Sequence, residues 1–455
     1  MSRSAKIHSK RVAFYLVAAL VPLAGLLSLV GSAQPAAAYG TGCAHAVVKP
    51  VGPFHIAGDH RTVVDSKGRP FISYGTTVPG LSNPKLTSYP KTDLPKIDAT
   101  ADQWCGNTVR LQVSQYAVTG NTTPDNGGCR NTYLNKALDP EVRRAENDGL
   151  VVVINDQTES DSMVNPAFAN SEKDPTKATF AFWNCVTAHR ESWGSHKTYA
   201  QDQQVVFDIF NEPRVDACPA SQGGHGPNGP YLMNLWRNGT VTAGNFTGCG
   251  QNGLRYQGMD AVAYHIRVDD KAKNLLWVEG PGNGNTLAGL AQKECGSTPT
   301  GNCLISPSLG PIVYSIHHPY ANPDAGKSPP ADPATWWKEF GWVVDHPAAI
   351  GVAPVVVGEW TNFPWYDHVK TEPYCWPDAP TSVRNFLSYL HTLKVGLNAY
   401  QLAAPPTGYL LKKEGDWTDT TNYTDSKWKA SYCTTSGAPL LGPGTDIRHW
   451  FQQQD

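Results

Sequence analysis

The sequence lacks a second long hydrophobic segment. Its one uncharged apolar run extends from Val12 to about Val30, follows basic residues at positions 3, 6, 10 and 11, and precedes the small-residue tripeptide Ala36-Ala37-Ala38. This order predicts a signal peptide over residues 1–38, cleaved after Ala38, and therefore a secreted protein. An uncleaved membrane anchor is the alternative, because the run approaches the length of a spanning helix.

The sequence also lacks an excess of charge of either sign. Its 37 basic residues nearly balance 39 acidic ones, which argues against a nucleic-acid or anionic membrane partner and is compatible with a neutral sugar. No Ser/Thr/Pro-rich linker and no internal repeat divides residues 39–455, which argues against an appended binding module. We expect these residues to form one domain and a monomer.

Metal-binding motifs are missing as well. The sequence has no C-x-x-C pair and no H-E-x-x-H, which argues against zinc as the explanation for its ten cysteines. All of them follow the proposed cleavage site, so up to five disulfides are expected in an oxidising environment. Cys295 and Cys303 flank a Gly/Pro/Ser-rich loop and are the expected local bridge, while the other pairings stay open. We expect no metal and no cofactor.

Short apolar segments alternate with helix-like ones along the chain. The eight candidate strands are Phe71–Tyr74, Thr108–Val113, Leu150–Ile154, Val205–Phe210, Leu275–Val278, Ile312–Ile316, Val355–Val357 and Leu397–Tyr400. Candidate helices between them include Pro175–Trp193, Tyr256–Lys271, Pro333–Val344 and Ser382–Leu393. The pattern predicts an α/β fold, a (β/α)8 TIM barrel. An open doubly wound sheet is the alternative, which the absence of G-x-G-x-x-G after the first strand disfavours.

A β-hairpin is expected ahead of the first strand. Residues 62–65 and 69–72 are strand-like and flank the turn sequence Ser66-Lys67-Gly68. Such a hairpin could plug the floor of the barrel.

Two glutamates follow apolar strands. Asn211-Glu212-Pro213 ends the fourth strand and Gly358-Glu359-Trp360 ends the seventh. Polar residues at strand ends mark the active face of a TIM barrel. Hydrolysis of a glycosidic bond needs an acid and a second carboxylate, which two glutamates from different strands would supply. Either residue alone could instead be a salt-bridged or solvated rim residue.

These motifs together resemble glycoside hydrolase family 5, the cellulase-like retaining enzymes. Asn107-Thr108-Val109-Arg110-Leu111 looks like that family's strand-two motif, and His318-Pro319-Tyr320 looks like its His-x-Tyr motif after strand six. The hairpin also resembles the family's opening segment, so the similarity runs from about residue 60 to about 400.

The resemblance implies roles for these residues. Glu212 would be the general acid/base and Glu359 the nucleophile of a double displacement. Arg110 and Tyr320 would hold Glu359, Asn211 would meet the sugar 2-hydroxyl and His318 would line the pocket. Structural roles are the alternative for all four: an unrelated ion pair for Arg110, rim packing for His318 and Tyr320, and a turn cap for Asn211.

The chain departs from the family at two pocket positions. Thr158 stands where the family commonly has a His, and Gln401 stands where it usually has a Trp that stacks under the sugar. Trp360, and likewise Trp365, Trp376 and Trp417, could stack on sugar rings or pack within loops. Glu279 ends the fifth strand and is interpreted as a secondary polar contact.

The motifs indicate a retaining O-glycosyl hydrolase acting on β-linked polysaccharide or oligosaccharide. The alternatives are a carbohydrate-binding barrel without turnover and a transglycosylase. The pattern does not identify the glycan, or distinguish endo from exo action. The latter depends on insertions at 121–131, 217–253 and 407–444, which contain Cys129, Cys218, Cys249 and Cys433 and are expected to be held by disulfides.

Overall fold

A computed structural model gives the fold of the chain. It describes Cys43 and residues 49–120, 128–169, 173–194, 196–215, 230–242, 256–290, 303–317, 333–345, 353–360, 379–403, 410, 411, 413, 415, 416, 418, 420 and 444–454. Residues Gly40–Asp455 group into one compact unit.

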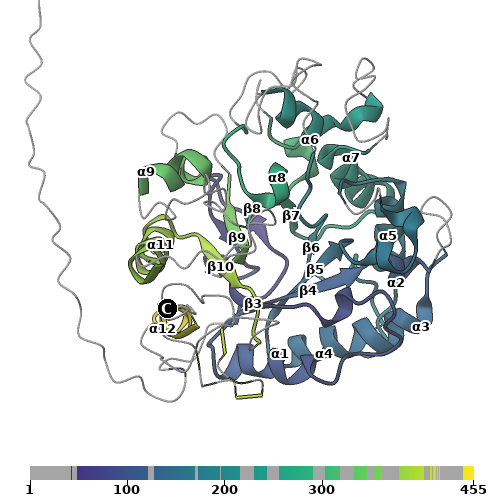
Figure 1. The fold of residues 1–455 in the computed structure, drawn as a ribbon, viewed down its shortest axis with the longest axis horizontal. Coiled ribbons are helices and arrows are strands. Elements are labelled where there is room, and N and C mark those ends of the chain that lie inside the picture. Colours follow the sequence, from purple (N-terminus) through teal and green to yellow (C-terminus); the bar gives the residue numbers. More distant parts are fainter. Residues whose placement is uncertain are drawn as a thin grey trace, which may run out of the picture. The chain divides into compact units, whose positions relative to one another are not determined.

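Eight parallel strands close into a barrel in the order β10-β3-β4-β5-β6-β7-β8-β9 (Figure 1). They are β3 (Tyr74–Val78), β4 (Thr108–Ser114), β5 (Val151–Gln157), β6 (Val205–Asp208), β7 (Leu276–Glu279), β8 (Ile312–Ile316), β9 (Val355–Trp360) and β10 (Gly396–Ala399). The predicted TIM barrel is confirmed. The expected first strand, 71–74, was placed too early, because Phe71 belongs to the floor of the barrel and Tyr74 begins the strand.

Helices lie outside the strands (Figure 1). They are α1 (Asp93–Asp102), α2 (Gln115–Thr119), α3 (Asn131–Tyr133), α4 (Asp139–Asn147), α5 (Lys177–Ala188), α6 (Pro230–Thr242), α7 (Met259–Tyr264), α8 (Pro281–Gly284), α9 (Pro333–Trp336), α10 (Trp342–Asp345), α11 (Ala379–Leu393) and α12 (Gly444–Gln452). Single π-helical turns continue α7 over His265–Asp269 and join α9 to α10 over Trp337–Gly341. Among the described helices, none combines the length and the apolar character needed to cross a bilayer.

The alternation of side chains along each strand explains the two sides of the barrel wall. In β4, Val109, Leu111 and Val113 are fully buried in the large outer core between strands and helices. Arg110 and Gln112, one residue along from them, belong to the polar interior. This period of two places a different set of residues on each side of the wall.

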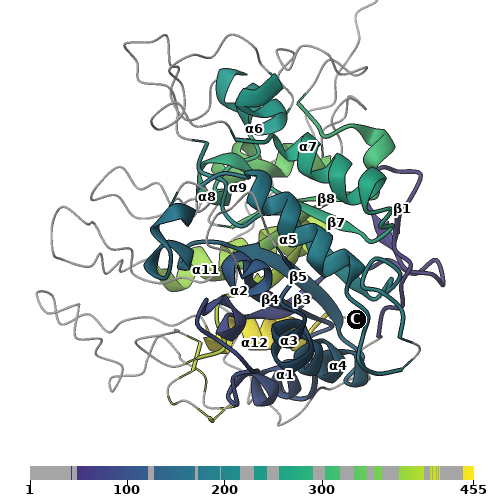
Figure 2. The same cartoon turned by 90° about the vertical axis from the view of Figure 1, so that its right-hand side faces the viewer.

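The predicted N-terminal hairpin is present and covers the floor of the barrel. Val64 pairs with Pro70, and the Phe71 N–H donates to the Val63 carbonyl at 2.8 Å. Strand β2 (Val63–Val64) also pairs with β1 (His55–Ile56), which was not expected from the sequence. Figure 2 shows β1 beside one end of β7 and β8, with α8, which follows β7, at the other end.

Apolar side chains join this hairpin to the inside of the barrel. The cluster comprises Phe54, Val63, Phe71, Val151, Val153, Val206, Leu275, Trp277, Val313 and Val356. Phe54 and Phe71 stack with ring centroids 4.8 Å apart. The hairpin therefore plugs the floor, as predicted.

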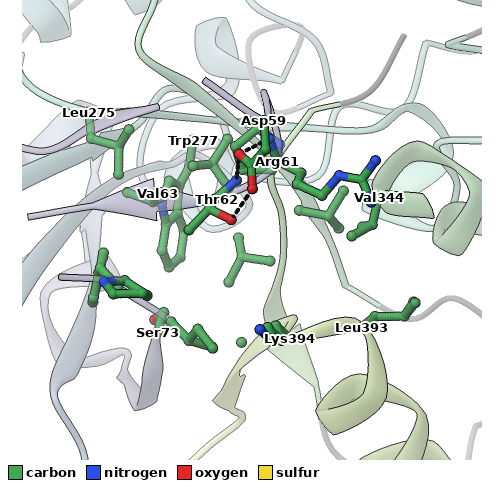
Figure 3. Close-up of a pocket in the computed structure, with 18 of the residues that line it drawn as sticks. Asp59, Arg61, Thr62, Val63, Ser73, Leu275, Trp277, Val344, Leu393 and Lys394 are labelled. Atoms are coloured by element: carbon green, nitrogen blue, oxygen red, sulfur yellow. Dashed lines mark hydrogen bonds between the residues drawn. The ribbon is translucent and has the colours of Figure 1, made fainter. Parts of the chain in front are cut away.

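A cavity of about 320 Å³ lies where β2 meets the amino ends of strands β7 to β10 (Figure 3). Its walls include Leu275 and Trp277, while Asp59, Arg61 and Lys394 contribute charged groups. Arg61 also approaches Asp345 on α10, with Nη1 and Oδ1 3.7 Å apart. The cavity is at the floor, away from the residues that end the strands.

Disulfides hold segments outside the barrel wall. Cys43 pairs with Cys105, and Cys129 pairs with Cys185 on α5. The second bridge fastens the end of the insertion at 121–131, as expected. Cys303 is also disulfide-bonded, whereas its expected partner Cys295 lies outside the described residues, as do Cys218, Cys249 and Cys433.

Candidate active site

Arg110 is the centre of a buried charge cluster at the carboxyl ends of the strands. Its Nε donates to Asp208 Oδ2 at 2.8 Å, its Nη1 to Glu359 Oε2 at 2.7 Å, and its Nη2 to Glu279 Oε1 at 2.9 Å and Asn211 Oδ1 at 2.7 Å. The side chain is 0% exposed. A planar guanidinium with donors on both edges can hold four such acceptors at once, which fixes their relative positions.

Glu359 faces the barrel interior because β9 contains a bulge. Leu397 pairs with Val357 and Ala399 pairs with Trp360, so β9 has one residue more than β10 between these pairs. Gly358 has no room for a side chain, since a Cβ there would lie 2.1 Å from Ser315 Oγ. An extra residue in a strand changes the direction of the side chains that follow it. Glu359 therefore enters the site and Trp360 leaves it.

Glu212 has an unusual backbone conformation. Its φ is +47°, in the left-handed region that a non-glycine residue adopts at a cost. Its backbone N–H donates to Glu279 Oε2 at 2.6 Å, and His317 Nδ1 lies 3.1 Å from Glu212 Oε1. Its side chain is 18% exposed, compared with 9% for Glu359. Glu212 thus lies nearer to the mouth of the site.

The two glutamates lie close together. One carboxylate oxygen from each, with a ring nitrogen of His317, forms a group of atoms within 4.8 Å of one another. Carboxyl groups about 5 to 5.5 Å apart are typical of retaining glycosidases, whereas inverting enzymes separate them by roughly 6.5 to 9.5 Å to admit a water molecule.

The same three residues could in principle bind a metal ion. Their spacing in the sequence gives no sign of this, since Glu212 and Glu359 come from other strands than His317. However, Arg110 and Gln112 already donate to Glu359 Oε2, at 2.7 and 2.9 Å. These donors and the cationic Arg110 disfavour a metal cation at this position.

Burial and charge shift the pKa values in the cluster. Burial raises the pKa of Glu359 to about 7; His317 and Arg110 oppose this shift, and Glu212 and Glu279 add to it. Burial alone would lower the pKa of His317, but Glu279, Glu212 and Glu359 raise it well above its ordinary value. The three carboxylates therefore favour the cationic form of His317.

Two further side chains near Glu212 were not identified from the sequence. Glu159 shares a hydrogen bond with Glu212. Burial raises the pKa of Glu159 to about 8, and the charges of Glu212 and Glu359 add to this shift. Tyr400 directly follows β10. Burial raises the pKa of its hydroxyl, and the charges of Glu359, Glu159 and Glu212 raise it further. The Tyr400 hydroxyl therefore lies within the electrostatic range of these carboxylates.

The structure shows how deeply three of the expected substrate-binding residues are buried. Thr158 is fully buried and Gln401 is 7% exposed. Of the two roles left open for Trp360, sugar stacking and packing, the structure shows packing: Trp360 is 0% exposed and packs on Phe386 of α11, with ring centroids 4.9 Å apart. The bulge in β9 turns it to the outer core. His318, Tyr320, Trp365, Trp376 and Trp417 lie outside the described residues.

Sequence reasoning missed Asp208 and His317 and undervalued Glu279, all of them 0% exposed. Asp208 in β6 and Glu279 in β7 are acidic residues in otherwise apolar strands. Alternate residues of a strand face the barrel interior, and the position of these two acids in that alternation is the signal that could have identified them. Val313 and Ser315 in β8, and His317 directly after it, likewise alternate with outward-facing residues. His317, one residue before the expected His318, is the imidazole that contacts Glu212.

Comparisons with known proteins agree with this geometry. The model of the cellulase family, glycosyl hydrolase family 5, matches residues 64–363. A comparison with curated protein sequences found no match. An endocellulase from Pyrococcus horikoshii, solved with cellotetraose, is similar over 82% of this chain and 97% of its own, at 16% identity and a TM-score of 0.50. An endo-β-1,4-glucanase from Xanthomonas axonopodis pv. citri is similar over 84% and 100%, at 12% identity and a TM-score of 0.51. At these identities the structural similarity supports the fold alone.

Proposed function

The chain belongs to glycosyl hydrolase family 5, and from this premise we propose that it is a retaining enzyme that cleaves β-linked glycans with Glu359 as nucleophile and Glu212 as acid/base. The observation that carries the proposal is the short distance between one carboxylate oxygen of each residue, within 4.8 Å. So short a distance supports a retaining reaction, because inverting enzymes separate the carboxyl groups by roughly 6.5 to 9.5 Å to admit a water molecule.

In the first step Glu359 attacks the anomeric carbon as the bond to the leaving oxygen breaks, and Glu212 gives its proton to that oxygen. In the second step water attacks the glycosyl ester, Glu212 takes the proton of that water, and Glu359 leaves as a carboxylate. Donation from Arg110 and Gln112 to Glu359 Oε2, at 2.7 and 2.9 Å, stabilises the charged nucleophile.

Glu212 needs a proton before the first step. Repulsion between carboxylates that lie close together favours the protonated form of one of them. The neighbouring carboxylates of Glu279 and Glu359 therefore favour protonation of Glu212, whereas His317 opposes it. Once Glu359 is esterified, its negative charge disappears. The ionised form of Glu212 is then no longer opposed by that charge, and Glu212 can act as a base.

The proposal also covers the glycan that the enzyme cleaves and the location of the protein. A β-glucan is the first candidate, because the two structurally similar proteins described above are named an endocellulase and an endo-β-1,4-glucanase. Thr158 and Gln401 differ from the family pattern, so mannans and galactans belong in the same assay. We also propose export, with residues 1–38 removed, which fits the disulfides at Cys43–Cys105 and Cys129–Cys185.

The test is product release from a panel of β-glucans, β-mannans, galactans and aryl β-glycosides by the wild type, Glu212→Ala and Glu359→Ala. We expect both variants to lose activity by about 100-fold or more. Azide should restore turnover of activated aryl glycosides, giving the β-glycosyl azide with Glu212→Ala and the α-glycosyl azide with Glu359→Ala. Glu141→Gln, a buried glutamate on the outer helix α4, is the matched control.

Three outcomes would contradict the proposal. Full activity of Glu359→Ala would overturn the mechanism, and initial release of the α-anomer by the wild type would overturn retention. Binding of a glycan without any cleavage would support the alternative, a carbohydrate-binding barrel. Excess acceptor sugar in the assay separates hydrolysis from transglycosylation by the products formed.

A further inference from the structure

Glu279 is the third carboxylate of the cluster, at the end of β7, and it is 0% exposed. We propose that Glu279 is a positioning residue that holds Glu212 in the geometry needed for proton transfer. This inference rests on the proposed function, because it concerns the acid/base step of that reaction.

The first support comes from the main chain of Glu212. Glu279 Oε2 accepts the Glu212 N–H at 2.6 Å. Glu212 has φ +47°, a conformation that persists in a non-glycine residue only when the surroundings stabilise it. The contact from β7 supplies such stabilisation across 67 residues of sequence.

The second support comes from the side chain of Glu212. Glu279 Oε1 lies 3.1 Å from His317 Nε2, and His317 Nδ1 lies 3.1 Å from Glu212 Oε1. The contacts form a closed ring from the Glu212 main chain through Glu279 and His317 to the Glu212 carboxylate. Glu279 thus contacts the main chain of the acid/base residue directly, and through His317 it also fixes the position of the Glu212 carboxyl group.

Only a carboxylate satisfies this arrangement. The Glu212 N–H donates to Glu279 Oε2 and Arg110 Nη2 donates to Oε1, and His317 Nε2 lies 3.1 Å from Oε1. A glutamine has one acceptor oxygen, so its amide N–H2 would face a donor in either orientation. The nucleophile is less dependent on Glu279, since Arg110 keeps Asp208 and Asn211 as partners and Gln112 also holds Glu359.

This difference between the two glutamates defines the experiment. Glycosides with a poor leaving group need the proton from Glu212 in the first step, whereas a dinitrophenyl leaving group departs without one. We expect Glu279→Gln to lower kcat/KM about 100-fold for phenyl and unsubstituted glycosides and less than about threefold for the dinitrophenyl glycoside. A loss of structure alone would lower both rates by the same factor.

Two further variants complete the test. Glu279→Asp keeps both acceptor oxygens on a shorter side chain, and we expect the same selectivity with a smaller loss, which serves if Glu279→Gln is poorly folded. Glu141→Gln replaces a buried glutamate outside the cluster and should change neither rate. Equal losses on both leaving groups, or none, would overturn the inference alone. Absence of cleavage by the wild type would instead overturn the proposed function, and the inference with it.

Discussion

The two ends of the barrel interior are built from the same strands with opposite chemistry. In β6, Val206 belongs to the apolar floor, while Asp208 two residues later is bonded to Arg110. In β7, Trp277 and Glu279 show the same change. Interior positions therefore stabilise the fold at the amino ends of the strands and form the charge cluster at the carboxyl ends, which is the usual division in this fold.

The largest expected effect is at Arg110, because that residue neutralises the carboxylates of the cluster. Arg110→Met should lower the free energy of unfolding by about 3 to 5 kcal/mol, since it leaves buried carboxylates without their cation, and it should also abolish turnover. Denaturant unfolding and the glycoside assay measure the two effects.

Arg144 is the control for this change, because it bonds Asp98 with a side chain that is 46% exposed. Arg144→Met should cost less than about 1 kcal/mol and leave the activity unchanged. If the two variants lost similar stability, the buried cluster would not be the tightly coupled unit that its contacts indicate.

A substitution in the floor of the barrel should lower stability without lowering activity. Phe71→Ala removes a ring that stacks on Phe54 in the floor cluster. We expect a loss of about 3 to 5 kcal/mol in stability, with kcat/KM per folded molecule unchanged. Glu212→Gln should show the reverse, with stability retained and activity lost. A catalytic defect in folded Phe71→Ala would show that the two ends are coupled.

The smallest expected effect concerns pH. Burial raises the pKa of Glu359 to about 7, and the nucleophile must be ionised, so kcat/KM should fall as the pH drops below about 7. Glu159→Gln removes a carboxyl group beside Glu212 and Glu359. Because the pKa of Glu159 is about 8, its charge repels the other carboxylates only at alkaline pH, so the substitution should move the alkaline limb of the pH profile to lower pH and leave the limb near pH 7 in place. An unchanged profile would exclude this electrostatic contact.

Local patterns in the sequence predicted much of this molecule. Apolar segments located all eight strands, with a displacement only at the first, because buried parallel strands need continuous apolar runs. The turn at Ser66-Lys67-Gly68 predicted the hairpin that plugs the floor. The family resemblance pointed to Glu212, Glu359 and Arg110, which the structure brings together.

Tertiary structure alone decided how these residues are held. Arg110 contacts Asp208, Glu279 and Glu359 across 98, 169 and 249 residues of sequence, and only closure of the barrel brings such distant positions to one point. The bulge in β9 sent Glu359 inward and Trp360 outward, against simple alternation. Strand periodicity is a local property that the chain carries in its sequence, whereas contacts across the barrel depend on register and on irregularities that no local pattern records.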